Sequence, residues 1–107
     1  MRSTPVVAIA VLAGCAGPLS RAESQFAEGR YPDAKQTLET AEADSRSWND
    51  SRRAQYALYR GLTYAALGDR EQAGTWLHEA RAIEDAHPGS LSPEDARRLK
   101  AAFDAGE

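Results

Sequence analysis

Few side chains in this sequence are of the types that do chemistry in catalytic or metal sites. The chain of 107 residues holds one cysteine, Cys15, and two histidines, His78 and His87. Neither histidine has a plausible nucleophilic side chain near it in the sequence, and no serine lies in a Gly-x-Ser-x-Gly turn. Two carboxylate pairs could be considered for acid–base chemistry but are far more typical of solvated helix faces: Glu39 with Glu42, and Glu79 with Glu84. We therefore expect no enzyme, no cofactor and no metal site.

Composition and charge exclude further classes of protein. With 13 Lys and Arg against 16 Asp and Glu the formal net charge is −3, so the chain has no basic field to hold nucleic acid. A single cysteine excludes both a disulfide framework and a zinc site built from thiolates. The length suits one small domain. These counts exclude function classes but identify no partner.

The first residues have the pattern of a secretory signal. Arg2 and the amino terminus give a positive head, and an unbroken apolar run extends from Val6 to Ala13. As a helix this run would be about 12 Å long, far short of the roughly 30 Å of a bilayer core. It therefore predicts a signal sequence and not a membrane span. The run closes with Leu12-Ala13-Gly14-Cys15, which resembles the lipobox of bacterial lipoproteins.

The lipobox resemblance implies a lipid anchor. In that family the cysteine sulfur takes a diacylglycerol, the signal is removed, and the new amino terminus is acylated, typically with palmitate. We accordingly expect residues 1–14 to be the signal peptide and residues 15–18 to be the lipidated Cys15 with a short tether. Ala16 stands where aspartate retains enterobacterial lipoproteins in the inner membrane, which implies the outer membrane, periplasmic side, although the rule varies between lineages. The alternative is an ordinary signal-peptidase site beside a chance cysteine.

Residues 19–104 have the composition and punctuation of a helical domain. Ala, Glu, Arg, Leu and Gln dominate, and all are good helix formers. Asp69, with Gln72 three residues later, and Ser92, before Pro93, are expected to cap helices. The pattern predicts an all-α fold with helices at 19–28, 32–44, 51–67, 70–85 and 93–104.

The chain repeats a pattern of small residues at a fixed offset. Gly29, Ala34 and Ala41 recur 39 positions later as Gly68, Ala73 and Ala80, which predicts a repeated helix-turn-helix unit. The second copy resembles a tetratricopeptide repeat (TPR) through Gly61, Tyr64, Leu67, Gly68, Ala73, Trp76 and Ala80. This resemblance implies a short TPR-like α-α superhelix of about two helix-turn-helix repeats plus a C-terminal capping helix. Arg60 departs from the family pattern, which prefers leucine there.

The family pattern also assigns packing roles. Small residues are expected where helices approach closely, at Gly61, Ala73 and Ala80. Large ones are expected to fill the space between helices, namely Tyr64, Leu67 and Trp76. Gly68 is expected to end its helix in a left-handed conformation.

A TPR array binds peptides or partner helices on a concave face formed by the first helix of each repeat. The resemblance places four residues of the 51–67 helix there as partner-binding residues: Gln55, Leu58, Tyr59 and Leu62. On the 19–28 helix it places Glu23 and Phe26. The alternative is that the last helix or the connector around Trp48 covers these side chains. Trp48 itself suits either a small satellite core or an exposed anchor at an interface.

These observations predict a non-catalytic adaptor or assembly factor in an envelope complex. Its partners would be an envelope protein or peptide on the concave face and the membrane through the lipid anchor, with no nucleic acid. The alternative is a structural or cell-wall-associated envelope lipoprotein. Arg52 and Arg53 suit an acidic partner, lipid headgroups or simple solvation. Such arrays usually need about three repeats for stability, so a homodimer or low stability is expected.

Overall fold

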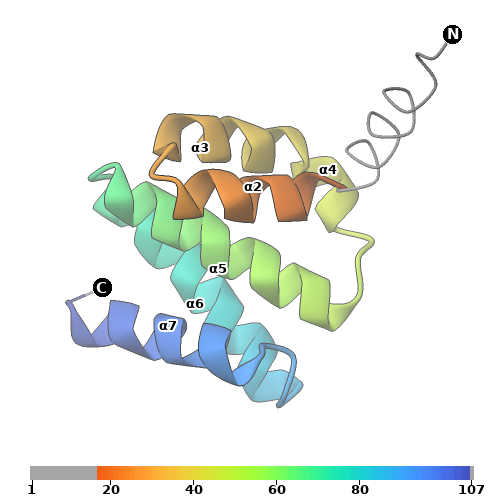
Figure 1. Cartoon of the computed structure of the whole chain (residues 1–107). Helices are drawn as coiled ribbons and strands as arrows, with labels where there is room; N and C mark the ends of the chain where they lie inside the picture. Colours follow the sequence, from red (N-terminus) through yellow and green to blue (C-terminus); the bar gives the residue numbers. More distant parts are fainter. Residues whose placement is uncertain (1–16, 107) are drawn as a thin grey trace, which may run out of the picture.

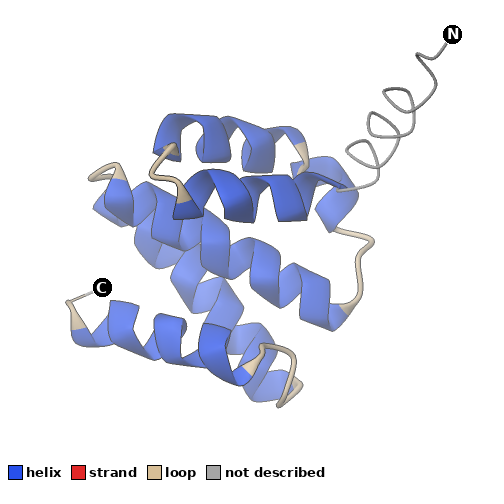
Figure 2. Ribbon diagram, in the orientation of Figure 1, coloured by secondary structure: helices blue, strands red, loops and turns tan. Residues whose placement is uncertain are grey.

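The computed structural model describes residues 17–106; the predicted signal peptide, the lipobox and Cys15 lie outside these residues. Within this range every regular element is a helix, which confirms the all-α fold (Figures 1 and 2). The helices are α2 (Gly17–Ala27), α3 (Tyr31–Thr40), α4 (Glu42–Ser45), α5 (Asp50–Ala66), α6 (Arg70–Ala86) and α7 (Pro93–Asp104). Four of the five predicted helices match α2, α5, α6 and α7 to within two residues at each end.

Side-chain caps fix where three of these helices begin. The backbone N–H of Gln72 donates to Asp69 Oδ1 at 3.1 Å, and that of Asp95 donates to Ser92 Oγ at 3.1 Å. Both caps were expected from the sequence. The third cap, Asn49, accepts from the N–H of Arg52 at 2.9 Å and starts α5. In each case the cap satisfies a backbone donor that the first helical turn leaves free.

Two helical hairpins, α2–α3 and α5–α6, form the body of the domain, and α3 and α2 both pack on α5 (Figure 1). The turns contain Gly29 at φ 78° and Gly68 at φ 86°, a region that only glycine enters without strain. Gly68 thus ends α5 in the left-handed conformation expected of it. Leu67, the C-cap residue just before it, is 40% exposed and does not fill the space between helices as expected.

Close approach of α5 and α6 depends on Gly61. A Cβ at this position would lie 2.7 Å from Cγ and Cδ2 of Leu77 and 3.0 Å from the Leu77 backbone nitrogen. Ala73 and Ala80 on α6 have no exposed surface, so small side chains line the same interface. The large residue that meets Gly61 is Leu77, which the repeat pattern did not single out.

Gly61→Ala is expected to lower the free energy of unfolding by about 1–3 kcal/mol, the usual penalty of overpacking. The methyl group would collide with Leu77, and this outweighs the gain of about 1 kcal/mol in helix propensity. Gly74→Ala on α6 is the matched control, because a Cβ there meets nothing within 4 Å; it is expected to stabilise. Urea unfolding of both variants measures whether each raises or lowers the free energy of unfolding. Stabilisation by Gly61→Ala would contradict the close approach of α5 and α6 at this residue.

The prediction of one continuous helix over 32–44 is wrong. Ala41, with φ −87° and ψ 2°, ends α3, and its N–H is shared between the carbonyls of Thr37 and Leu38 at 3.2 and 3.1 Å. This tightened last turn changes the chain direction before the single turn of α4. Glu42, the first residue of α4, is thereby brought 2.8 Å from a guanidinium nitrogen of Arg60 on α5. Alanine-rich periodicity contains no signal of such a turn.

Candidate functional site

The structure does not expose the predicted partner-binding strip as a surface. Leu58 has no exposed surface and Tyr59 is 7% exposed, while Gln55 and Leu62 are half-buried. The Tyr59 hydroxyl donates to Asp95 Oδ1 of α7 at 3.2 Å, and the Phe26 ring of α2 meets the Tyr59 ring edge-on at 5.7 Å. The last helix therefore covers this face of α5, as in the alternative left open above. Leu58 and Tyr59 belong to the core, so a partner cannot contact the apolar strip in this conformation.

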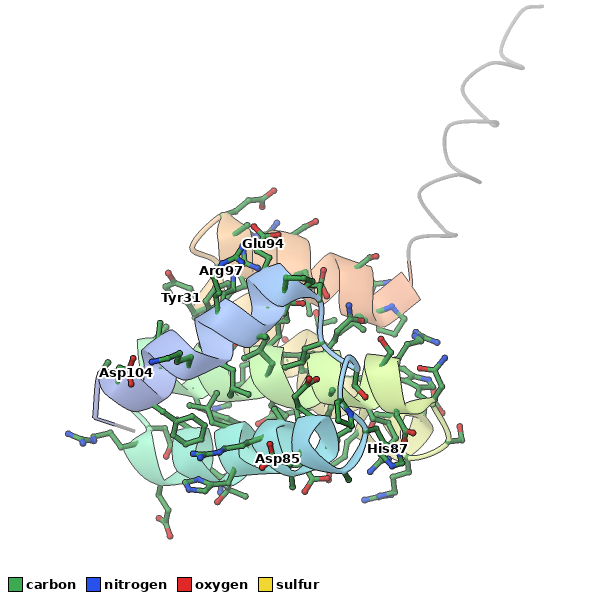
Figure 3. The ribbon with its side chains drawn as sticks, turned by 90° about the horizontal axis from the view of Figure 1, so that it is seen from below. Tyr31, Asp85, His87, Glu94, Arg97 and Asp104 are labelled. Carbon is green, nitrogen blue, oxygen red and sulfur yellow. The ribbon has the colours of Figure 1, made fainter. Side chains whose placement is uncertain are left out.

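A groove nevertheless remains between the helices that flank α5. Both α2 and α7 pack on α5, and the hollow between them has a volume of about 440 Å³. In Figure 3 the labelled Glu94 of α7 lies toward α2. Tyr59 forms part of the lining, which otherwise comes from α2 and from the start of α7: Ser20, Glu23, Ser24, Ala27, Ser92, Glu94, Asp95 and Arg98. Of the six residues predicted for the concave face, only Glu23 and Tyr59 line this groove, and its other side chains are mostly polar.

The groove carries three carboxylates and one guanidinium. Asp95 is 9% exposed in its side chain and accepts from Arg98 at 2.8 Å as well as from Tyr59. The pKa of the half-buried Glu23 carboxyl is raised, first by burial and then by the charge of Asp95, against the opposing effect of Arg98. Burial, followed by the charge of Asp95, raises the pKa of Tyr59 to about 12. The ionised form of Glu23 is therefore disfavoured in this groove, and a further cation beside it would stabilise that form.

A second polar cluster, which sequence reasoning missed, surrounds Arg60. Its guanidinium lies 4.4 Å from the centre of the Trp76 ring and donates to Glu42 at 2.8 Å and to the hydroxyls of Tyr56 and Tyr64 at 2.9 and 3.2 Å. Burial alone would lower the pKa of Arg60, but the bonds to Glu42 and Tyr64 raise it overall. The Nε atom is buried without a partner. The signal for this cluster was the arginine at a position where the family prefers leucine.

Trp48 packs against the main core and not in a satellite core of its own. It is half-buried and meets the Tyr56 ring edge-on at 5.7 Å, which places it at the margin of the core. The guanidinium of Arg52 lies 4.3 Å from the centre of the Trp48 ring, on the outside of the molecule. The neighbouring Arg53 instead pairs with Asp50 at 3.5 Å and with Glu79 at 3.7 Å. The structure thus separates two arginines that the sequence presents as a pair.

The two histidines lie in unrelated surroundings. The His78 ring packs edge-on against Phe103 at 5.1 Å, and its Nδ1 lies 2.9 Å from the Gly74 carbonyl. His87 Nδ1 lies 3.4 Å from Asp50. Over residues 17–106 no three His, Cys, Asp or Glu side chains are grouped so as to hold a metal ion. Over the same range no helix combines the length and the apolar character needed to cross a bilayer.

Comparisons with models of protein families, with curated proteins and with solved structures find no match to this chain. The resemblances to the lipobox and to TPR units therefore rest on the residues that carry them.

Proposed function

We propose that this protein is a membrane-anchored, non-catalytic interaction module, an adaptor or assembly factor of an envelope complex with TPR-like repeats. Its groove between α2 and α7 would hold a positively charged segment of the partner. The proposal rests on the groove itself, where Glu23 and Asp95 both line the hollow. Burial and the charge of Asp95 raise the pKa of the Glu23 carboxyl there. The proposed anchor rests on Leu12–Cys15, and the proposed location on the periplasmic side of the outer membrane rests on Ala16.

The physical case for a cationic segment follows from the charges that line the groove. Glu23, Glu94 and Asp95 outnumber the single Arg98, which pairs with Asp95 at 2.8 Å and with Glu94 at 3.3 Å. A lysine or arginine of a partner placed near Glu23 would offset the repulsion from Asp95 and lower the pKa of the Glu23 carboxyl again. The exposed serines Ser20, Ser24 and Ser92 offer further hydrogen bonds along the rims.

Photo-cross-linking in the envelope of the producing cell tests the groove. A benzophenone amino acid in place of Ser24, an exposed residue of α2 that lines the groove, is expected to capture one defined partner. The same group in place of Glu71, exposed on α6, is the matched control and is expected to capture none. Equal capture from both positions would contradict the groove. Capture of only a second copy, or of cell wall, would favour a homodimer or the structural lipoprotein.

Glu23→Gln is expected to stabilise the fold at pH 7 while weakening partner capture. The folded-state pKa of Glu23 lies above its unfolded value, so the favourable contribution of its proton is present below the unfolded pKa and is lost as pH rises through the folded pKa. At pH 7 the ionised group therefore opposes folding. In thermal unfolding, Glu23→Gln should raise the melting temperature more at pH 7 than at pH 4. The control Glu71→Gln should change neither the melting temperature in this way nor partner capture. Stabilisation with unchanged capture would place the partner elsewhere.

A further inference from the structure

One end of the domain lies next to the predicted anchor. The helix α2 begins at Gly17, beside α4 in Figure 1, and Pro18 and Arg21 line one surface hollow together with Ala41 and Asp44. Cys15 precedes Gly17 by two residues, which span at most about 7 Å of extended chain. A lipid on Cys15 would therefore hold this end, formed by the start of α2, by α4 and by the connector to α5, close to the headgroups.

The same end displays side chains suited to a lipid surface. Arg21, Arg46 and Arg52 are exposed, and the Arg52 guanidinium lies over the ring of the half-buried Trp48. Arg46 also pairs with Glu42 at 3.5 Å, in an exposed ion pair. Two carboxylates of this end are engaged by cations of the protein: Glu42 pairs with Arg60 at 2.8 Å, and Asp50 pairs with Arg53 at 3.5 Å. Asp44 is a further exposed acid there. The exposed charged residues of this end are thus three arginines and one aspartate, whereas the chain as a whole has a net charge of −3.

We propose that this membrane-facing end, defined by Arg21, Arg46, Trp48 and Arg52, rests on the anionic headgroups of the bilayer that holds the anchor. Tryptophan favours the boundary between headgroups and acyl chains because its ring is apolar and its N–H is polar. Arginines beside it bind phosphate, and their attraction to anionic lipid adds to that of the anchor. The inference rests on the proposed lipid anchor and adds an orientation to it.

The proposal orients the domain. The helix α5 is 17 residues long and spans about 25 Å, with Trp48 two residues before its first residue and Leu67 just after its last. With Trp48 at the headgroups, Leu67 and the two glycine turns point away from the bilayer. The position of Leu67 also supplies a probe at the far end of the same helix, and its exposure of 40% leaves room for a larger side chain.

Quenching by brominated lipid measures this orientation. The protein is purified with its lipid from membranes and reconstituted into vesicles of phosphatidylethanolamine with one quarter phosphatidylglycerol, with and without bromine on the acyl chains. Trp76→Phe leaves Trp48 as the only tryptophan, and Trp48→Phe with Trp76→Phe and Leu67→Trp moves the probe to the far end. We expect Trp48 to be quenched at least about two-fold more strongly than the probe at position 67. Arg52→Glu should weaken the quenching of Trp48, and Arg97→Glu, exposed on α7, should not.

Each outcome is decisive, because mass spectrometry of the purified protein reports whether Cys15 carries lipid. Lipid on Cys15 with equal quenching at the two positions overturns the membrane-facing end and leaves the anchor intact. Strong quenching of Trp48 that Arg52→Glu does not change removes the anionic headgroups as the partner of these arginines. A chain without lipid on Cys15 overturns the proposed anchor, and this inference falls with it.

Discussion

Leu58→Glu is expected to unfold the domain, because this residue lies in the core and not on a binding surface. Its side chain has no exposed surface and packs among the apolar residues that α5 buries against its neighbours. A carboxylate there would lose its hydration without a cationic partner. We expect a loss of about 4–5 kcal/mol or more, a large part of the 5–15 kcal/mol that stabilises a typical domain.

Circular dichroism with urea unfolding measures this effect. Gln55→Glu, one turn earlier on α5 and half-buried, is the matched control and should change stability by no more than about 0.5 kcal/mol. The comparison separates two accounts of the same helix face. A folded, stable Leu58→Glu variant that had lost only its partner would show that Leu58 belongs to a docking strip after all.

Arg60→Ala is expected to lower the free energy of unfolding by about 3 kcal/mol, whereas Arg60→Leu should remain within about 1 kcal/mol of the unmodified protein. Alanine removes the packing on Trp76 and the bonds to Glu42 and Tyr56, and leaves a hole. Leucine refills the space next to Trp76. The loss of the charge is mild, because the buried Nε of Arg60 has no partner and the cluster is only partly satisfied.

The Arg60 comparison shows whether packing or charge holds the domain at this position. Urea unfolding of the two variants gives the numbers directly. If Arg60→Leu were as unstable as Arg60→Ala, the pair with Glu42 and the bonds to the tyrosines would dominate. If neither variant lost stability, Arg60 would be a tolerated substitute in a core that does not depend on it.

Local signals in the sequence sufficed for most of the helices. Asp69 and Ser92 cap as expected, and Gly68 turns the chain through a positive φ, because each of these effects depends on a residue and its immediate neighbours. The break at Ala41 was not predictable. Alanine is a good helix former, and the turn becomes apparent only in the pairing of Glu42 with Arg60, 18 residues further along the chain.

The candidate site was harder to predict than the fold. Periodicity identifies the face of α5 that is apolar, but not whether α7 covers it, because the covering depends on contacts such as that between Tyr59 and Asp95. The groove follows from the same contact. Glu23 was placed on the concave face from the repeat pattern, yet the effect of Asp95 on its pKa required the positions of α2 and α7.

Cross-linked recovery of the full-length protein from its own envelope tests the central claim most directly. We expect the unmodified protein to recover one defined envelope partner from the membrane fraction. Cys15→Ala should lose both the lipid mass and that partner. Unchanged mass, membrane fractionation and partner recovery in Cys15→Ala would contradict the account of an anchored adaptor.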